Sequence, residues 1–184
     1  MNPKEAVRVV LGALQDAKIA HMVTGSLASN YYGIERSTKD ADIVLETAMQ
    51  DFGSFARQLG DGLVIDPQVT FETITGSWRH IVEVRGTLFK IELFLLSTDP
   101  HHQERFARRR TVRLRSWDLE TWIASAEDVL IQKIRWGRRK DLDDAEGVLG
   151  VQGDALDFAY IEKWCAAHGT LERLAELRRS IPPI

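Results

Sequence analysis

The apolar residues at the start of the chain recur at helical intervals. Between residues 3 and 17 they fall three or four positions apart, which places them on one face of an amphipathic helix. Asn2 and Glu5 have the spacing of a capping box, and Pro3 occupies a first-turn position whose backbone needs no N–H. The pattern therefore predicts a helix that begins at Pro3 and packs one face into a core.

The following segments alternate between short apolar runs and short helical patterns, with Gly33 and Gly60 as stops. The expected order is strand 21–24, helix 27–32, strand 41–46 and helix 49–59. A region rich in β-branched and aromatic residues then predicts strands at 63–65, 69–75, 80–85 and 88–95, with a hairpin turn at 85–87.

The last third of the chain changes from mixed to helical patterning. We expect a helix or loop at 100–110 and a strand at 111–114. Ser125 and Asp128 have a second capping-box spacing and open a helix. Its expected end is 134 or 136, and further helices are predicted at 142–149, 158–167 and 171–178. We therefore expect a core at 1–118 and a helical C-terminal subdomain at 119–184 that packs on it.

Two carboxylates follow a glycine–serine pair. Gly25-Ser26 lies between a predicted strand and helix, where glycine permits a tight turn and the free N–H groups of the helix attract an anion. Asp40 and Asp42 begin the next strand and, being two residues apart, face the same side. Paired carboxylates repel unless a cation lies between them, and Mg²⁺ prefers carboxylates with substrate phosphates. The alternative is an incidental pair at a turn or a solvated strand end.

A third carboxylate lies on a later strand. In residues 88–95 the odd-numbered positions are apolar, and Glu92 lies on the opposite face beside Lys90. A charge in so apolar a strand is costly unless it is exposed, paired or bound to metal. If this strand neighbours that of Asp40 and Asp42, the three carboxylates make a two-metal site for phosphoryl transfer. The alternative is an edge-strand Glu92 paired with Lys90.

Composition narrows the class of protein. Of the 184 residues, 44% are apolar and 28% charged, which excludes a disordered or collagen-like chain. No apolar stretch approaches the roughly 18 residues of a membrane span, and no secretion signal opens the sequence. The single cysteine, Cys165, forms no intramolecular disulfide, and the histidines lack zinc spacing. We therefore expect a soluble, cytoplasmic protein without a membrane partner.

The net charge of −3 hides a segregation of charge. Between Arg105 and Lys140 there are eleven Lys and Arg against four Asp and Glu. Such a stretch forms either a groove for phosphates or the solvated faces of helices. The charge alone leaves both interpretations open.

Together, Gly25-Ser26, the spacer, Asp40-Ala41-Asp42 and the later strand carboxylate resemble the signature of the nucleotidyltransferase superfamily of DNA polymerase beta type. The resemblance spans residues 20–97. It extends to 149 through segments 125–133 and 140–144, which resemble a helical motif of abortive-infection and type IV toxin nucleotidyltransferases. It implies an α/β (α+β) fold with a mixed, twisted sheet flanked by helices and a C-terminal helical extension.

This resemblance also implies an activity: transfer of a nucleoside monophosphate from a nucleoside triphosphate (NTP), such as ATP, to an acceptor hydroxyl, with release of pyrophosphate. It implies that Gly25 and Ser26 hold the triphosphate. Asp40 and Asp42 would bind two Mg²⁺ or Mn²⁺ ions, and Glu92 would help to bind the metal that activates the hydroxyl.

Two further residues follow from the same resemblance. Lys133 would contact the nucleotide and Asp141 would be a supporting polar residue or base. Lys133 equally suits the polar face of an amphipathic helix, and Asp141 an acidic helix N-terminus. The family usually has Asp where this chain has Glu92; the longer side chain still ligates Mg²⁺ but shifts its geometry. Glu83 is the reserve candidate for the third carboxylate.

Several acceptors and two other classes of function stay open. The acceptor is an RNA or tRNA, a protein side chain or a small molecule such as an antibiotic, and the basic stretch favours RNA. A non-catalytic nucleotidyltransferase-like module, one half of a toxin–antitoxin pair, is the first alternative. An RNA-binding domain with incidental carboxylates is the second.

Overall fold

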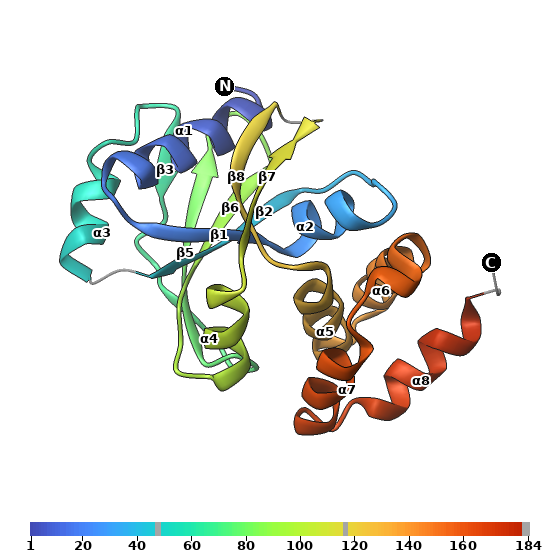
Figure 1. Ribbon diagram of the computed structural model, residues 1–184. Coiled ribbons are helices and arrows are strands. Elements are labelled where there is room, and N and C mark those ends of the chain that lie inside the picture. The colour runs from blue at the N-terminus through green and yellow to red at the C-terminus, as the bar shows by residue number, and fades with distance from the viewer. Residues whose placement is uncertain (47–48, 116–117, 182–184) are drawn as a thin grey trace.

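The computed structural model describes residues 1–46, 49–115 and 118–181. Within these ranges, eight strands form one mixed sheet: β1 (Ala20–Thr24), β2 (Asp40–Glu46), β3 (Leu63–Ile65), β4 (Thr70–Glu72), β5 (Ser77–Val84), β6 (Lys90–Leu95), β7 (Arg110–Leu114) and β8 (Leu119–Ile123). The helices are α1 (Pro3–Asp16), α2 (Gly25–Tyr32), α3 (Met49–Ala56), α4 (Pro100–Ala107), α5 (Ala126–Trp136), α6 (Arg139–Gln152), α7 (Phe158–Ala167) and α8 (Leu171–Ser180). Figure 1 shows α5 to α8 gathered at the end of the molecule opposite α1 and α3.

The order of strands brings distant parts of the sequence together. It runs β3-β5-β6-β2-β1-β8-β7, and β4 pairs with β5 outside this path. Strand β2 lies between an antiparallel β1 and a parallel β6, so the sheet is mixed. The predicted mixed sheet flanked by helices is confirmed.

Helix α1 begins where the capping pattern predicts. The Asn2 side chain accepts a hydrogen bond from the Glu5 backbone N–H, and the Glu5 carboxylate accepts one from the Asn2 N–H. These two bonds satisfy donors that the first turn leaves without helical partners. On the apolar face of the helix, Val10 and Leu14 are fully buried.

Strand β8 lies at the start of the segment 119–184, for which the sequence predicts a helical subdomain. The strand pairs with β7 and with β1. Its buried residues Thr121 and Ile123 alternate with the exposed Glu120 and Trp122, which is the period of a strand. Five residues of this pattern are too few to be distinguished from a helix by periodicity alone.

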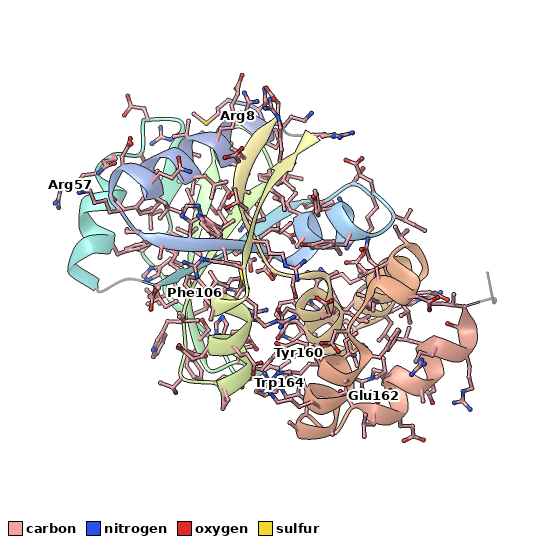
Figure 2. All side chains as sticks on the ribbon, viewed as in Figure 1. Arg8, Arg57, Phe106, Tyr160, Glu162 and Trp164 are labelled. Atoms are coloured by element: carbon pink, nitrogen blue, oxygen red, sulfur yellow. The ribbon has the colours of Figure 1, made fainter. Side chains whose placement is uncertain are left out.

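Helix α5 connects the sheet to the C-terminal helices. Its N-cap Ser125 accepts a hydrogen bond from the Asp128 N–H, as the capping spacing predicts. All residues from 126 to 134 are buried, because α2, α6 and α7 pack around the helix. On α7, Tyr160 and Trp164 lie on the side that faces α4 (Figure 2), and the Trp164 ring is 4.8 Å from that of His101 on α4.

Within the part of the chain that the structure describes, no helix combines the length and the apolar composition needed to span a bilayer.

Candidate active site

The turn between β1 and α2 is built around Gly25. Its φ angle is +59°, a left-handed conformation that an L-residue adopts only with strain. A Cβ at this position would lie 1.7 Å from Oδ2 of Asp42. The next residue, Ser26, is buried, and its Oγ accepts a hydrogen bond of 3.3 Å from Nη2 of Arg36. The turn predicted from the sequence therefore lies directly against the carboxylate of β2.

Asp40 and Asp42 face the same side of β2. Ala41 and Ile43, which alternate with them, are fully buried on the other side. Thr38 Oγ1 donates a hydrogen bond of 2.9 Å to Oδ1 of Asp40 and fixes that carboxylate. The structure thus brings together the two aspartates that the sequence singles out.

The parallel pairing of β2 with β6 aligns Glu92 with Asp42. The neighbouring strands required for a three-carboxylate site are therefore present. Glu92, however, pairs with Arg79 of β5, at 2.8 Å between Nη1 and Oε2. Lys90, expected as the alternative partner of Glu92, instead forms an ion pair with Glu83.

A cavity of about 320 Å³ opens in front of these carboxylates. Its acidic lining residues are Asp40, Asp42, Glu72 and Glu92, and its basic ones are Arg79, Lys133, Arg138 and Lys140. Ser26, Ile74, Phe94 and Trp136 complete the walls. The lining comes from both the sheet and the α5–α6 region, so both parts of the chain build the cavity.

Burial, and after it the neighbouring negative charges, disfavour the ionised form of Asp42. Desolvation raises the pKa of its carboxyl group to about 7, and the negative charges of Asp40 and Glu92 act in the same direction, against the opposing effect of Lys133. A cation bound between Asp40 and Asp42 would relieve this repulsion, and carboxylate oxygens are donors that Mg²⁺ and Mn²⁺ accept. The two aspartates therefore fit a divalent metal. Among the described residues, no three Asp, Glu, His or Cys side chains already form a metal-ligand cluster.

Lys133 lines the cavity, and its ammonium group forms ion pairs with two aspartates of α6. Its Nζ is 2.7 Å from Oδ2 of Asp144 and 3.3 Å from Oδ1 of Asp141, and all three side chains are almost completely buried. Asp141 also accepts a hydrogen bond of 2.5 Å from Nε of Arg138. Asp141 does not line the cavity but positions two cations that do.

Asp144 extends this network to the Gly25-Ser26 turn. It binds Arg36 in a bidentate manner, at 2.5 Å to Nε and 2.7 Å to Nη2. Although burial opposes ionisation of Asp144, the hydrogen bonds from Arg36 and Lys133 lower its pKa. Since Nη2 of Arg36 also contacts Ser26, the network joins α5 and α6 to the turn.

No family model and no curated protein matches the chain. Solved structures do match. The antibiotic-resistance factor ANT(2'')-Ia in complex with adenylyl-2''-tobramycin has a TM-score of 0.60 and 10% identity, over 92% of this chain and 98% of that one. The lincomycin-bound lincosamide antibiotic adenylyltransferase LnuA has a TM-score of 0.54 and 12% identity, over 80% and 96%. An antigenic nucleotidyltransferase-like protein from Paracoccidioides brasiliensis has a TM-score of 0.53 and 14% identity, over 98% and 94%.

The chain has the nucleotidyltransferase fold. The resemblance stated from Gly25-Ser26, Asp40 and Asp42 is confirmed at this level. At 10–14% identity the likeness concerns the fold alone.

Within this nucleotidyltransferase fold, the reserve candidate Glu83 lies away from the cavity. Its side chain is half exposed and pairs with Lys90, and it lines a separate pocket beside the β5–β6 turn. Glu92 is therefore the carboxylate that β6 brings to Asp42.

The cations of the basic stretch between Arg105 and Lys140 lie in two different environments in the nucleotidyltransferase fold. Arg105 is buried, Arg108 is paired with Asp128 and Arg135 with Asp99. Lys133, Arg138 and Lys140 reach the cavity instead. Part of the charge of this stretch thus joins α4 to α5 through ion pairs and does not face the cavity.

Sequence reasoning missed two residues of this arrangement. Arg79 belongs to no motif in the sequence, and the position of Arg36 near Asp40 suits a phosphate contact and a solvated loop residue equally. Their partners lie 13 and 108 residues away along the chain, so no local spacing signals either contact.

Proposed function

We propose that this chain is a metal-dependent nucleotidyltransferase that moves a nucleoside monophosphate from an NTP to an acceptor hydroxyl. The observation that carries the proposal is the position of Asp42, between Asp40 and Glu92 and against the Gly25 turn. The likeness in fold to ANT(2'')-Ia with adenylyl-2''-tobramycin and to the adenylyltransferase LnuA supports it.

Each wall of the cavity has a part in the proposed reaction. The N–H groups at the start of α2, at Gly25 and Ser26, bind phosphate oxygens. Asp40 and Asp42 hold Mg²⁺ or Mn²⁺, which supplies positive charge to the phosphate under attack. From the opposite wall, Lys140 offsets the remaining charge of the triphosphate.

The transfer itself forms one bond and breaks one. The acceptor oxygen bonds to the α-phosphorus while the α–β bridging P–O bond breaks, and pyrophosphate leaves with the bridging oxygen. The hydroxyl proton passes to the Glu92 carboxylate, which then releases it to solvent. Trp136 provides an aromatic wall on which a base can stack.

The test is binding of each α-labelled NTP with Mg²⁺ or Mn²⁺ and transfer of the label to a panel of acceptors, with the released pyrophosphate measured in parallel. Asp40→Asn and Asp42→Asn should each lower turnover at least about a hundredfold, because metal binding supplies several kcal/mol to such reactions. Glu83→Gln, which removes a carboxylate on the same sheet outside the cavity, should leave turnover unchanged. Turnover that is indifferent to both aspartates would refute the proposal.

A second candidate is a binding module of the same fold without catalysis. The ion pair between Arg79 and Glu92 favours this candidate, because it engages the carboxylate that the reaction would need as its base. Such a module would bind an NTP through the Gly25-Ser26 turn and a metal held by Asp40 and Asp42, but would release no pyrophosphate with any acceptor in the panel.

A further inference from the structure

The carboxylates on the β4–β6 side of the cavity are already engaged. Glu72 is held by its own turn: Oε1 accepts the Ile74 N–H at 2.6 Å, and Oε2 accepts the Thr75 N–H at 2.9 Å and the Thr75 hydroxyl. Glu92 is held by Arg79 at 2.8 Å. An amine of an incoming acceptor would have to share these carboxylates with the donors that already hold them.

The guanidinium group of Arg79 has protein partners on Nε and Nη1, and the side chain is also partly exposed to the cavity. Nε donates a hydrogen bond of 2.9 Å to Oγ1 of Thr70, and Nη1 binds Glu92. The side chain is 30% exposed and lines the cavity. A guanidinium group with five donors in a planar fork can keep one partner and exchange another.

The cations of the opposite wall are partly committed to the triphosphate. Lys140 and Arg138 lie with Lys133 on the α5–α6 side, and Asp40 and Asp42 are reserved for the metal. With those cations assigned to the triphosphate and the two aspartates to the metal, Arg79 is left beside Glu92 as a charged group with which an acceptor can pair.

Building on the proposed function, we propose that the acceptor is a hydroxyl compound that carries a phosphate group, and that Arg79 binds this phosphate. When Arg79 turns to the phosphate, Glu92 loses its ion pair and is free to take the hydroxyl proton. Binding of the acceptor thereby activates the base that the reaction needs. An amine-rich acceptor would instead place a positive charge beside the positive charge of Arg79, and the two would repel.

The two sources of such a group are a small sugar phosphate and the end of an RNA. Both combine a hydroxyl with a nearby phosphate, and they differ in size. Ribose 5-phosphate and an RNA dinucleotide with a free 3′-hydroxyl distinguish them. Ribose, which lacks the phosphate, and tobramycin, which is rich in amines, are the negative probes.

The experiment is equilibrium binding of these four probes to the protein saturated with Mn²⁺ and an NTP analogue whose α–β bridge is a methylene. The variants are Arg79→Gln and Arg79→Lys. Arg85→Gln is the matched control, because it removes the same charge at the exposed end of the β5–β6 hairpin.

We expect Arg79→Gln to weaken binding of a phosphate-bearing probe about tenfold or more, the effect of losing one charge-assisted hydrogen bond. Arg79→Lys should retain part of the affinity, and Arg85→Gln all of it. In the absence of acceptor, Arg79→Gln should also tighten Mn²⁺ binding, because Glu92 is released.

Equal binding of ribose and ribose 5-phosphate, preferred binding of tobramycin, or an Arg79→Gln variant with unchanged phosphate affinity would overturn the inference. A separate titration with the NTP analogue in the presence of Mn²⁺ and without acceptor gives the affinity for that analogue, which Arg79→Gln should leave within about twofold. Failure of the wild-type protein to bind that analogue would instead overturn the proposed function. Thermal unfolding of each variant verifies that it is folded.

Discussion

The Oδ2 atom of Asp42 occupies the space into which a side chain on Gly25 would project, 1.7 Å from the expected Cβ position. Gly25 also has a φ angle of +59°. Two independent constraints thus require glycine at the turn. The first comes from backbone conformation and the second from the approach of the β2 carboxylate.

Gly25→Ala should therefore cost more than backbone strain alone. A left-handed L-residue costs about 1–2 kcal/mol, and the overlap with Asp42 adds to this, so we expect a loss of at least about 3 kcal/mol in the free energy of unfolding. Gly169→Ala is the control, because Gly169 has a φ of +69° and open space around its Cβ. Chemical denaturation checks both; equal losses would show that the approach of Asp42 has no energetic effect. Gly25→Ala should also weaken Mn²⁺ binding.

Asp42→Asn should stabilise the metal-free protein at pH 8. The folded-state pKa of Asp42 is about 7 against an ordinary value of 3.8. Between these values the folded protein holds more protons than the unfolded chain, so the free energy of unfolding falls as the pH rises from about 4 to about 7. The neutral amide removes this loss. Since each pKa unit corresponds to about 1.4 kcal/mol, we expect a gain of about 4 kcal/mol at pH 8 that disappears near pH 4.

The measurement is urea denaturation of both proteins from pH 4 to 8, without and with Mg²⁺. Mg²⁺ should raise the stability of the wild-type protein and have little effect on Asp42→Asn. A variant that is less stable than the wild type at pH 8 without metal would contradict the prediction.

The sequence predicts most of the local structure and the central part of the candidate site. The capping residues Asn2 and Ser125 place two helix starts, since caps act over three or four residues. The Asp-x-Asp pattern places Asp40 and Asp42 on one face, because strand alternation is a local property. The position of Glu92 beside Asp42 depends on the order of strands in the sheet. The sequence predicts this position only if the strand of Glu92 neighbours that of Asp42.

Contacts between distant residues are the part that local reasoning does not reach. Arg79 pairs with Glu92 because β5 and β6 are antiparallel neighbours with one particular register. Asp144 meets Arg36 because α6 packs against α2. In both cases spacing along the chain carries no signal, since tertiary packing decides which charges meet.

Asp128 should be essential for the attachment of α7 to α5 and α4. Its fully buried carboxylate accepts hydrogen bonds of 2.7 Å from the hydroxyls of Tyr160 and Ser125, and its Oδ1 is 3.2 Å from Nε2 of His101. Asp128→Ala leaves these partners unsatisfied and should cost about 3–5 kcal/mol. Tyr160→Phe removes one hydrogen bond and should cost about 1 kcal/mol.

Tyr31→Phe is the control, because Tyr31 is an exposed tyrosine on α2. Denaturation curves measure all three variants. Burial of Asp128 opposes its ionisation, yet hydrogen bonds from His101, Ser125 and Tyr160 lower its pKa. The stabilisation that ionised Asp128 provides is thus present above the ordinary carboxyl pKa. It is lost as the pH falls through the lowered pKa of Asp128 in the folded protein. An acid-unfolding midpoint that is unchanged in Asp128→Ala would contradict this role.

Lys133 should stabilise the α5–α6 pair as well as contact the nucleotide. Lys133→Met leaves Asp141 and Asp144 without a shared, buried partner, and we expect a loss of about 3 kcal/mol in unfolding free energy. Asp144→Asn should lower NTP affinity although Asp144 does not line the cavity, because Arg36 would no longer be held against Ser26. Asp143→Asn is the matched control, as Asp143 is exposed on the same helix.

A double-mutant cycle of Lys133→Met and Asp144→Asn separates the two roles of Lys133. If the ammonium group acts on α6 through Asp144, the two stability losses should be non-additive by about 1–3 kcal/mol. If it also contacts the triphosphate, Lys133→Met should weaken NTP binding further in the Asp144→Asn background, since the bound phosphate is a second partner for the same charge. Additive stability losses with no effect of Lys133→Met on NTP affinity would exclude both roles.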